Sequence, residues 1–182
     1  MRDVEFSQAF KYVFNRPIGM LNILWIFLPI IGWLALIGYV IRIIQEYIRG
    51  KFRKLPYFRF SNNLVFGLIM FFKSLPLLIV FGIVSSIINK LPLGNITTIL
   101  LSLLILPMLF VNLFHKESVR ASFDLSVVKP VFSNLIDYVV VLIKTLVLQL
   151  IFMVMSIILV GIPALVFTKN IFIADFFRRH IK

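Results

Sequence analysis

Cysteine is absent from the 182-residue sequence, and histidine is nearly so, with only His115 and His180. The missing thiols exclude disulfide bonds, thiolate catalysis and cysteine-ligated metals. The two histidines lack the spacing of metal ligands, so we expect neither a metal site nor a cofactor. Glycine-rich phosphate loops, His-Glu-x-x-His zinc motifs and Gly-x-Ser-x-Gly nucleophile motifs are also missing. The sequence therefore favours a protein that is not an enzyme.

Acidic residues are scarce, since 7 aspartates and glutamates oppose 19 lysines and arginines for a net charge of +12. In a soluble protein this balance would indicate a nucleic-acid partner. Here the cations are spread over several segments and form no DNA- or RNA-binding motif. Hydrophobic residues make up 61% of the chain, against about 45–50% in soluble domains. We therefore expect the partners to be a lipid bilayer and its anionic lipids, not nucleic acid.

Two apolar runs, residues 64–88 and 96–114, have the length of membrane-spanning helices. About 20 residues suffice to cross a bilayer. The turn between the two runs is short and carries a single charge, that of Lys90. The two runs are therefore predicted to form an antiparallel hairpin of spanning helices.

Two further apolar runs are interrupted by helix-breaking residues. Residues 18–44 contain Pro29 and Gly32 near their middle, and residues 135–167 contain a Gly-Ile-Pro sequence. Proline removes a backbone donor and kinks a helix, and glycine loosens it further. The sequence therefore predicts an all-α integral membrane helical bundle whose first and last apolar segments are broken or re-entrant.

Three amphipathic stretches complete a single transmembrane domain over residues 1–182. Residues 1–17 and 115–134 place apolar side chains at helical spacing, which favours helices lying in the membrane interface. Residues 168–182 are predicted to form a basic amphipathic tail.

The distribution of cations between the runs predicts an orientation. Four simple crossings would divide the loop cations almost evenly between the two sides, which is unusual. Re-entrant first and last segments would instead place all of them except Lys90 on one side. We therefore favour a multi-pass protein of the plasma membrane, with both termini and the main basic loop cytoplasmic.

Lys73 and the basic loop are the candidate binding elements. Lys73 lies inside an apolar run, where it could face a solute or counter-ion, extend toward the interface or bond to helix-end carbonyls. The basic loop could form an anionic-lipid surface, or it could reflect only the positive-inside bias. Its five candidate residues are Arg49, Lys51, Arg53, Lys54 and Arg59.

Three functions remain open from the residues. The first is a non-enzymatic component of a membrane complex, or a lipid-organising protein, associated with a membrane protein partner or a second copy of the chain. The second is a small transporter or channel subunit, for an anionic solute if Lys73 faces it. The third is a lipid-modifying enzyme, for which Asp124, Asp137 and His115 are the only material. We favour the first because the sequence carries no catalytic motif.

Several short motifs resemble a prokaryotic family of polytopic membrane proteins classed as a domain of unknown function. They include Gly38-Tyr39-Val40-Ile41-Arg42, Leu55-Pro56, Ala121-Ser122-Phe123-Asp124-Leu125 and Asp137-Tyr138. The family pattern has alanine directly before Phe-Asp, whereas Ser122 intervenes here. The resemblance implies an integral membrane protein without an assigned activity, and it supplies no catalytic residues.

Overall fold

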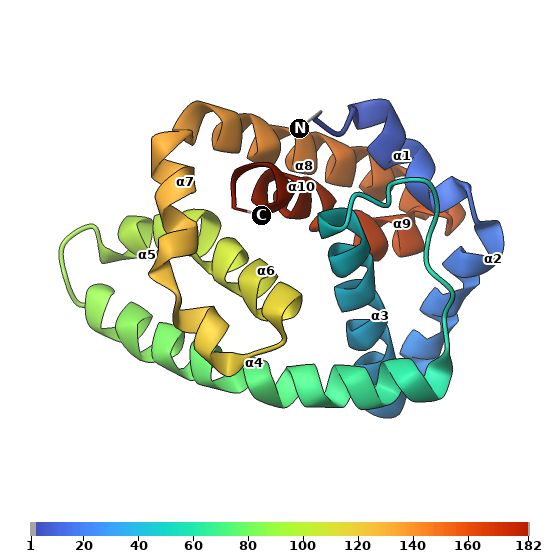
Figure 1. Ribbon diagram of the computed structural model, residues 1–182, viewed down its shortest axis with the longest axis horizontal. Coiled ribbons are helices and arrows are strands. Elements are labelled where there is room, and N and C mark those ends of the chain that lie inside the picture. Colours follow the sequence, from blue (N-terminus) through green and yellow to red (C-terminus); the bar gives the residue numbers. More distant parts are fainter. Residues whose placement is uncertain (1–2, 182) are drawn as a thin grey trace.

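The computed structural model of the protein describes residues 3–181, which contain helices and connecting segments but no strand (Figure 1). Most elements are α-helices, and four short ones are 3-10 helices, labelled η. In chain order the elements are α1 (Phe6–Phe14), α2 (Pro17–Met20), η1 (Leu21–Phe27), α3 (Ile31–Ile48), α4 (Phe60–Ile88), α5 (Gly94–Leu104), α6 (Leu106–Lys116), η2 (Val119–Phe123), η3 (Leu125–Val128), α7 (Lys129–Ser133), α8 (Leu135–Met155), η4 (Ser156–Ile158), α9 (Gly161–Thr168) and α10 (Ile171–His180).

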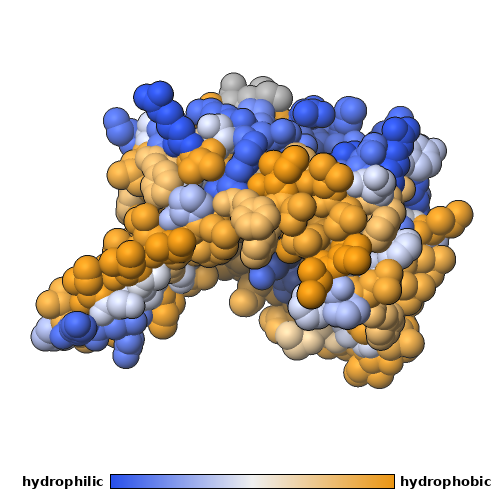
Figure 2. Space-filling view, turned by 90° about the horizontal axis from the view of Figure 1, so that it is seen from below, coloured by the Kyte–Doolittle hydropathy of each residue, from blue (hydrophilic) through white to orange (hydrophobic). Residues whose placement is uncertain are grey.

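Four helical segments are long and apolar enough to cross a membrane, namely Ile31–Ile48, Phe60–Ile88, Gly94–Lys116 and Leu135–Ile158. Most side chains of the last three segments are not buried by the rest of the protein. A soluble protein rarely exposes apolar surface on this scale. Figure 2 shows hydrophobic side chains over most of one face, with hydrophilic ones gathered along its upper edge. The predicted fold class, an all-helical membrane bundle, is confirmed.

The first apolar segment is broken, as predicted, and the chain reverses direction there. After η1 the backbone of Ile30 takes a positive φ of 63°, and α3 begins at the next residue. Gly32 permits the tight return, because a Cβ at this position would lie 1.8 Å from the carbonyl oxygen of Trp25. The segment therefore forms a hairpin of η1 and α3.

The last apolar segment is broken in a comparable way. Leu159 has a φ of 62°, and α9 then begins at Gly161, where a Cβ would lie 2.0 Å from the carbonyl oxygen of Phe152. Gln149 of α8 bonds to Thr168 of α9 across this hairpin at 3.2 Å. Both interruptions in the sequence therefore become chain reversals.

Helices α3 and α4 form the most extensive contact between helices in the bundle. At their crossing Gly38 and Gly67 bring the two backbones together. A Cβ on Gly38 would lie 2.1 Å from the carbonyl oxygen of Asn63, and one on Gly67 would lie 1.8 Å from that of Leu34. Small residues allow this close approach in membrane proteins, where packing replaces the hydrophobic effect between helices.

The C-terminal stretch, predicted as a basic amphipathic tail, lies in the centre of the bundle. Helix α10 is surrounded by α3, α6 and α8 (Figure 1), and every residue from Ile171 to Arg178 is buried. Phe172, Phe176 and Phe177 fill this core. Arg178, at the basic end of α10, can be buried because its charge is paired with that of Asp175 at 2.6 Å.

The two predicted interfacial stretches contact protein more than the amphipathic patterns alone indicate. In α1 the predicted apolar face packs on other helices, since Phe6 stacks on Phe172 and Phe10 stacks on Phe152. Residues 115–134 form η2, η3 and the short α7 instead of one helix. Glu117 ends α6 in a left-handed conformation, and Asp124 starts the next turn by accepting a bond from the amide of Ser126.

Candidate functional site

Polar segments that are far apart in the sequence bond to one another at one end of the bundle. Asn15 donates to the carbonyl oxygen of Arg53 at 2.6 Å, and Arg16 donates to that of Leu55 at 2.7 Å. Lys144 of α8 pairs with Asp3 at 2.7 Å. The N-terminal segment, the basic loop and the middle of α8 therefore occupy the same end of the molecule.

The basic loop presents its five predicted cations to the surroundings. Arg49, Lys51, Arg53, Lys54 and Arg59 are all exposed. Within residues 3–181 none of them forms an ion pair, whereas Lys116, Lys144, Arg178 and Arg179 each have a carboxylate partner. No carboxylate of the described chain therefore lies within ion-pair distance of these five cations, although Glu46 interacts at longer range with the charges of Arg49 and Lys51.

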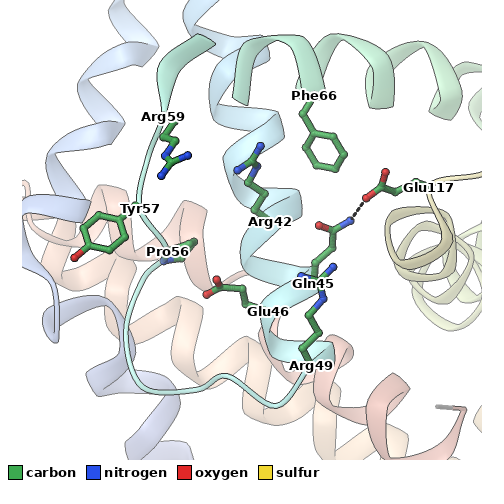
Figure 3. A pocket seen from close by; sticks show the side chains of 9 residues that line it. All are labelled: Arg42, Gln45, Glu46, Arg49, Pro56, Tyr57, Arg59, Phe66 and Glu117. Atoms are coloured by element: carbon green, nitrogen blue, oxygen red, sulfur yellow. Dashed lines mark hydrogen bonds between the residues drawn. The ribbon is translucent and has the colours of Figure 1, made fainter. Parts of the chain in front are cut away.

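Beside this loop lies a polar cavity of about 430 Å³, which we call the α3–α4 pocket (Figure 3). One helical face of α3 forms its floor, the start of α4 and the end of the basic loop form one wall, and the end of α6 closes it. Its lining residues are Arg42, Gln45, Glu46, Arg49, Pro56, Tyr57, Arg59, Phe66 and Glu117.

Hydrogen bonds hold one wall of the α3–α4 pocket in place. Gln45 donates to the carbonyl oxygen of Phe114 at 2.7 Å and to the carboxylate of Glu117 at 2.8 Å. Lys73 of α4 donates to the backbone oxygen of Glu117 at 2.7 Å. Three helices, α3, α4 and α6, are thereby joined at a single residue.

Lys73 thus lies at the C-terminal end of α6, where its ammonium group meets a helix-end carbonyl. This is one of the three roles that the sequence left open for Lys73. A cation suits this position because the last carbonyls of a helix lack partners and carry partial negative charge. The contact also brings the middle of α4 beside the C-terminal end of α6, where polar groups lie close to Lys73.

Sequence reasoning did not select Arg42, although it lies within the first apolar run. The structure places Arg42 inside α3, which continues past the predicted end of that run to Ile48. A signal was present in the spacing, since Arg42, Gln45, Glu46 and Arg49 recur on one helical face. The guanidinium carbon of Arg42 lies 5.6 Å from the centre of the Phe66 ring.

The other ionisable candidates lie in two separate clusters. Asp137 contacts Arg179 and His180, each at 2.8 Å. Asp124 contacts Lys116 at 3.4 Å and Ser126. Hydrogen bonds from Ser126 lower the pKa of the Asp124 carboxyl, so it stays ionised at neutral pH.

His115 stands apart from both clusters, with its ring against that of Phe177. Within residues 3–181 no group of three or more histidine, aspartate or glutamate side chains is arranged to hold a metal ion. The structure therefore does not assemble Asp124, Asp137 and His115 into one site.

A network of charges fastens the N-terminal segment to α10. Asp175 is buried and accepts bonds from Arg178, Arg179 and the amide of Val4. Burial lowers the pKa of Arg179, but the hydrogen bond and the charge of Asp137 outweigh it and leave that pKa raised. For Asp3, burial raises the pKa and the bond from Lys144 opposes it, with a net lowering. Asp3 and Arg179 are therefore charged at neutral pH, which suits a structural role.

The fold and the exposed apolar surface define the chain as a polytopic helical membrane protein. Residues 21–161 match the model of a family described as a protein of unknown function, DUF4013. Because the match covers most of the sequence, the chain belongs to this family, as the resemblance of its motifs indicated. No curated protein and no solved structure gives a significant match.

Proposed function

We propose that the protein is a non-enzymatic component of the plasma membrane that binds anionic lipids through its basic loop. The observation that carries this proposal is the group of five exposed cations without a carboxylate partner in the described chain. They lie at the polar end of a bundle whose remaining surface is largely apolar. A cation held near an anionic leaflet contributes about 1 kcal/mol to its attraction.

The contacts between polar segments support a cytoplasmic basic face. Residues 3–16, the basic loop and α10 contact one another, which supports a position on the same side of the membrane for all three. The positive-inside rule then favours the cytoplasm for that side and for both termini. The turn between α4 and α5, with Lys90, would reach the opposite side.

The two other functions gain less support from the contacts. Lys73 is bonded to a helix-end carbonyl, so a solute would have to displace an existing partner. Asp124 and Asp137 are held in different clusters by their own cations, so they do not offer a pair of carboxylates for lipid chemistry.

Lipid co-purification tests the proposal. The protein would be extracted from native membranes in mild detergent, and bound lipids and proteins would be quantified by mass spectrometry. Replacing Arg49, Lys51, Arg53, Lys54 and Arg59 by glutamine should lower the ratio of anionic to zwitterionic lipid several-fold. The matched control exchanges lysine and arginine at the same five positions and should keep the wild-type ratio.

An unchanged lipid ratio in the glutamine variant would reject the lipid-binding role. If a stoichiometric protein also co-purified, its loss from the glutamine variant would assign the loop to a membrane complex instead.

A further inference from the structure

We propose that the α3–α4 pocket is a specific binding site for the phosphodiester headgroup of a phospholipid, with Arg42 and Arg59 as ligands of the phosphate. This inference rests on the proposed function, because it names the lipid group that one part of the basic face selects. It differs from a diffuse basic surface in requiring one lipid at one place.

Two guanidinium groups face each other across the pocket. Arg42 projects from α3, and Arg59 lies directly before the first residue of α4. Figure 3 shows their guanidinium groups directed toward each other above the floor of the pocket. Neither side chain forms an ion pair within residues 3–181. Planar guanidinium groups match phosphate oxygens and bind them in pairs of hydrogen bonds, so this arrangement suits a phosphate between them.

Arg42 is a costly residue at its position. It lies within Ile31–Ile48, one of the segments apolar enough to cross a membrane. Its contact with the ring of Phe66, at 5.6 Å, does not neutralise its charge, and within residues 3–181 it forms no ion pair. Ionisable residues within such segments usually pair with another group or mark a binding path. An anionic ligand would supply the partner that the described chain does not provide.

The net charge of the pocket lining favours a ligand that carries a single negative charge. Three arginines and two glutamates give the lining a formal net charge of +1. Of the two carboxylates, Glu117 is engaged by Gln45 at 2.8 Å, whereas Glu46 has no bonded partner within residues 3–181. A monoanion neutralises this lining, whereas a dianion would add a second negative charge near the carboxylate of Glu46, which interacts only at longer range with the charges of Arg49 and Lys51. The balance therefore favours a phosphodiester over a phosphomonoester.

The apolar part of the lining indicates that the ligand is a lipid. Phe66 closes the pocket on the side of α4, and Ile69, which follows one turn along the same face, is 45% exposed. A cavity of about 430 Å³ holds a headgroup but not two acyl chains. The chains would therefore lie outside the pocket, along the exposed apolar flank of α4.

Binding of short-chain lipids to the full-length protein in detergent tests this site by native mass spectrometry. Dioctanoyl-phosphatidylglycerol should bind saturably with a stoichiometry of one. The Arg42→Gln and Arg59→Gln variants should each weaken it by about tenfold or more, since a charge-assisted bond is lost. Lys11→Gln and Lys90→Gln, at exposed cations outside both the basic loop and the pocket, serve as matched controls and should leave this affinity unchanged.

A variant that is expected to bind a lipid more tightly makes the test independent of folding defects. Glu46→Gln raises the net charge of the lining, so dioctanoyl-phosphatidic acid, a dianion, should bind more tightly to this variant than to the wild type. A misfolded variant would not gain affinity. If Glu46→Gln leaves phosphatidic acid binding unchanged, or if Arg42→Gln binds phosphatidylglycerol normally, the site is rejected.

Inorganic phosphate and dioctanoylglycerol separate the sources of the ligand. Neither should compete with dioctanoyl-phosphatidylglycerol at equal concentration, because one lacks the chains and the other lacks the phosphate. Full competition by phosphate alone would overturn the lipid assignment in favour of a soluble anion. A variant with only Lys51, Arg53 and Lys54 replaced by glutamine tests the broader function separately, because it leaves every residue of the pocket lining in place. Loss of anionic-lipid enrichment in this variant can therefore occur with the Arg42 and Arg59 site intact.

Discussion

At the scale of single residues, the bonding partner of an ionisable side chain separates structural from functional roles. Lys73 and Arg42 both lie in apolar helices. Within residues 3–181 Lys73 donates a hydrogen bond to the carbonyl oxygen of Glu117 at 2.7 Å, whereas Arg42 has no hydrogen-bonded or ion-paired partner. Sequence reasoning selected Lys73 because it lies in the middle of an apolar run. It overlooked Arg42 because that residue lies near the end of its run, beside the basic loop. Position in the sequence alone did not distinguish a satisfied cation from an unsatisfied one.

The Lys73→Met variant should therefore be a stability variant. Loss of one charge-assisted hydrogen bond at a partly exposed site should lower the free energy of unfolding by about 1 kcal/mol. For a chain of this size, that corresponds to a fall in Tm of about 2–4 °C, measured by thermal unfolding in detergent. Lys90→Met, in the exposed turn after α4, is the control and should keep the wild-type Tm. A wild-type Tm for Lys73→Met, together with lost solute flux in reconstituted vesicles, would instead support a transport role.

At the scale of helices, helix-breaking residues and the lengths of apolar runs predicted the spans and the chain reversals. The burial of the polar C-terminal helix could not be predicted in this way. The predicted spans 64–88 and 96–114 correspond to α4 and to α5 with α6, and both interrupted runs became hairpins. The position of α10 was not predictable, because its sequence of basic and aromatic residues suits an interface equally well. Its burial depends on Asp175, whose partners Val4 and Arg179 come from opposite ends of the chain.

The crossing of α3 and α4 depends on glycine at position 67. In Gly67→Ala the new Cβ would meet the backbone oxygen of Leu34, which cannot rotate away as a side chain can. We expect a loss of about 1–3 kcal/mol in the free energy of unfolding, the range for overpacked sites. Gly82→Ala, on the same helix, has open space around the new Cβ and should be neutral or slightly stabilising. Equal Tm values for the two variants would contradict a close crossing at Gly67.

At the scale of the whole molecule, polar and apolar surfaces are separated. Hydrophilic side chains gather along one edge in Figure 2, while the α4–α5 hairpin extends away from the bundle at the left. The near-equal cation count for four simple crossings was the sequence signal for this arrangement. The hydrogen bonds from Asn15 and Arg16 to the basic loop hold these two segments together, as the proposed arrangement with both on one side of the membrane requires.

The most direct test of this account is the labelling of single cysteines from outside intact cells, which the cysteine-free sequence makes straightforward. Ser7, Ser61 and Ser118 are exposed at the polar end, and Asn95 is exposed beside the turn after α4. Asn95 is preferable to Gly94, where a Cβ would lie 2.0 Å from the carbonyl oxygen of Ile88. We predict that an impermeant thiol reagent labels the Asn95→Cys variant alone, with the other three labelled only after permeabilisation. Labelling of Ser61→Cys but not Ser7→Cys in intact cells would place the basic loop and the N-terminal segment on opposite sides and would contradict the account.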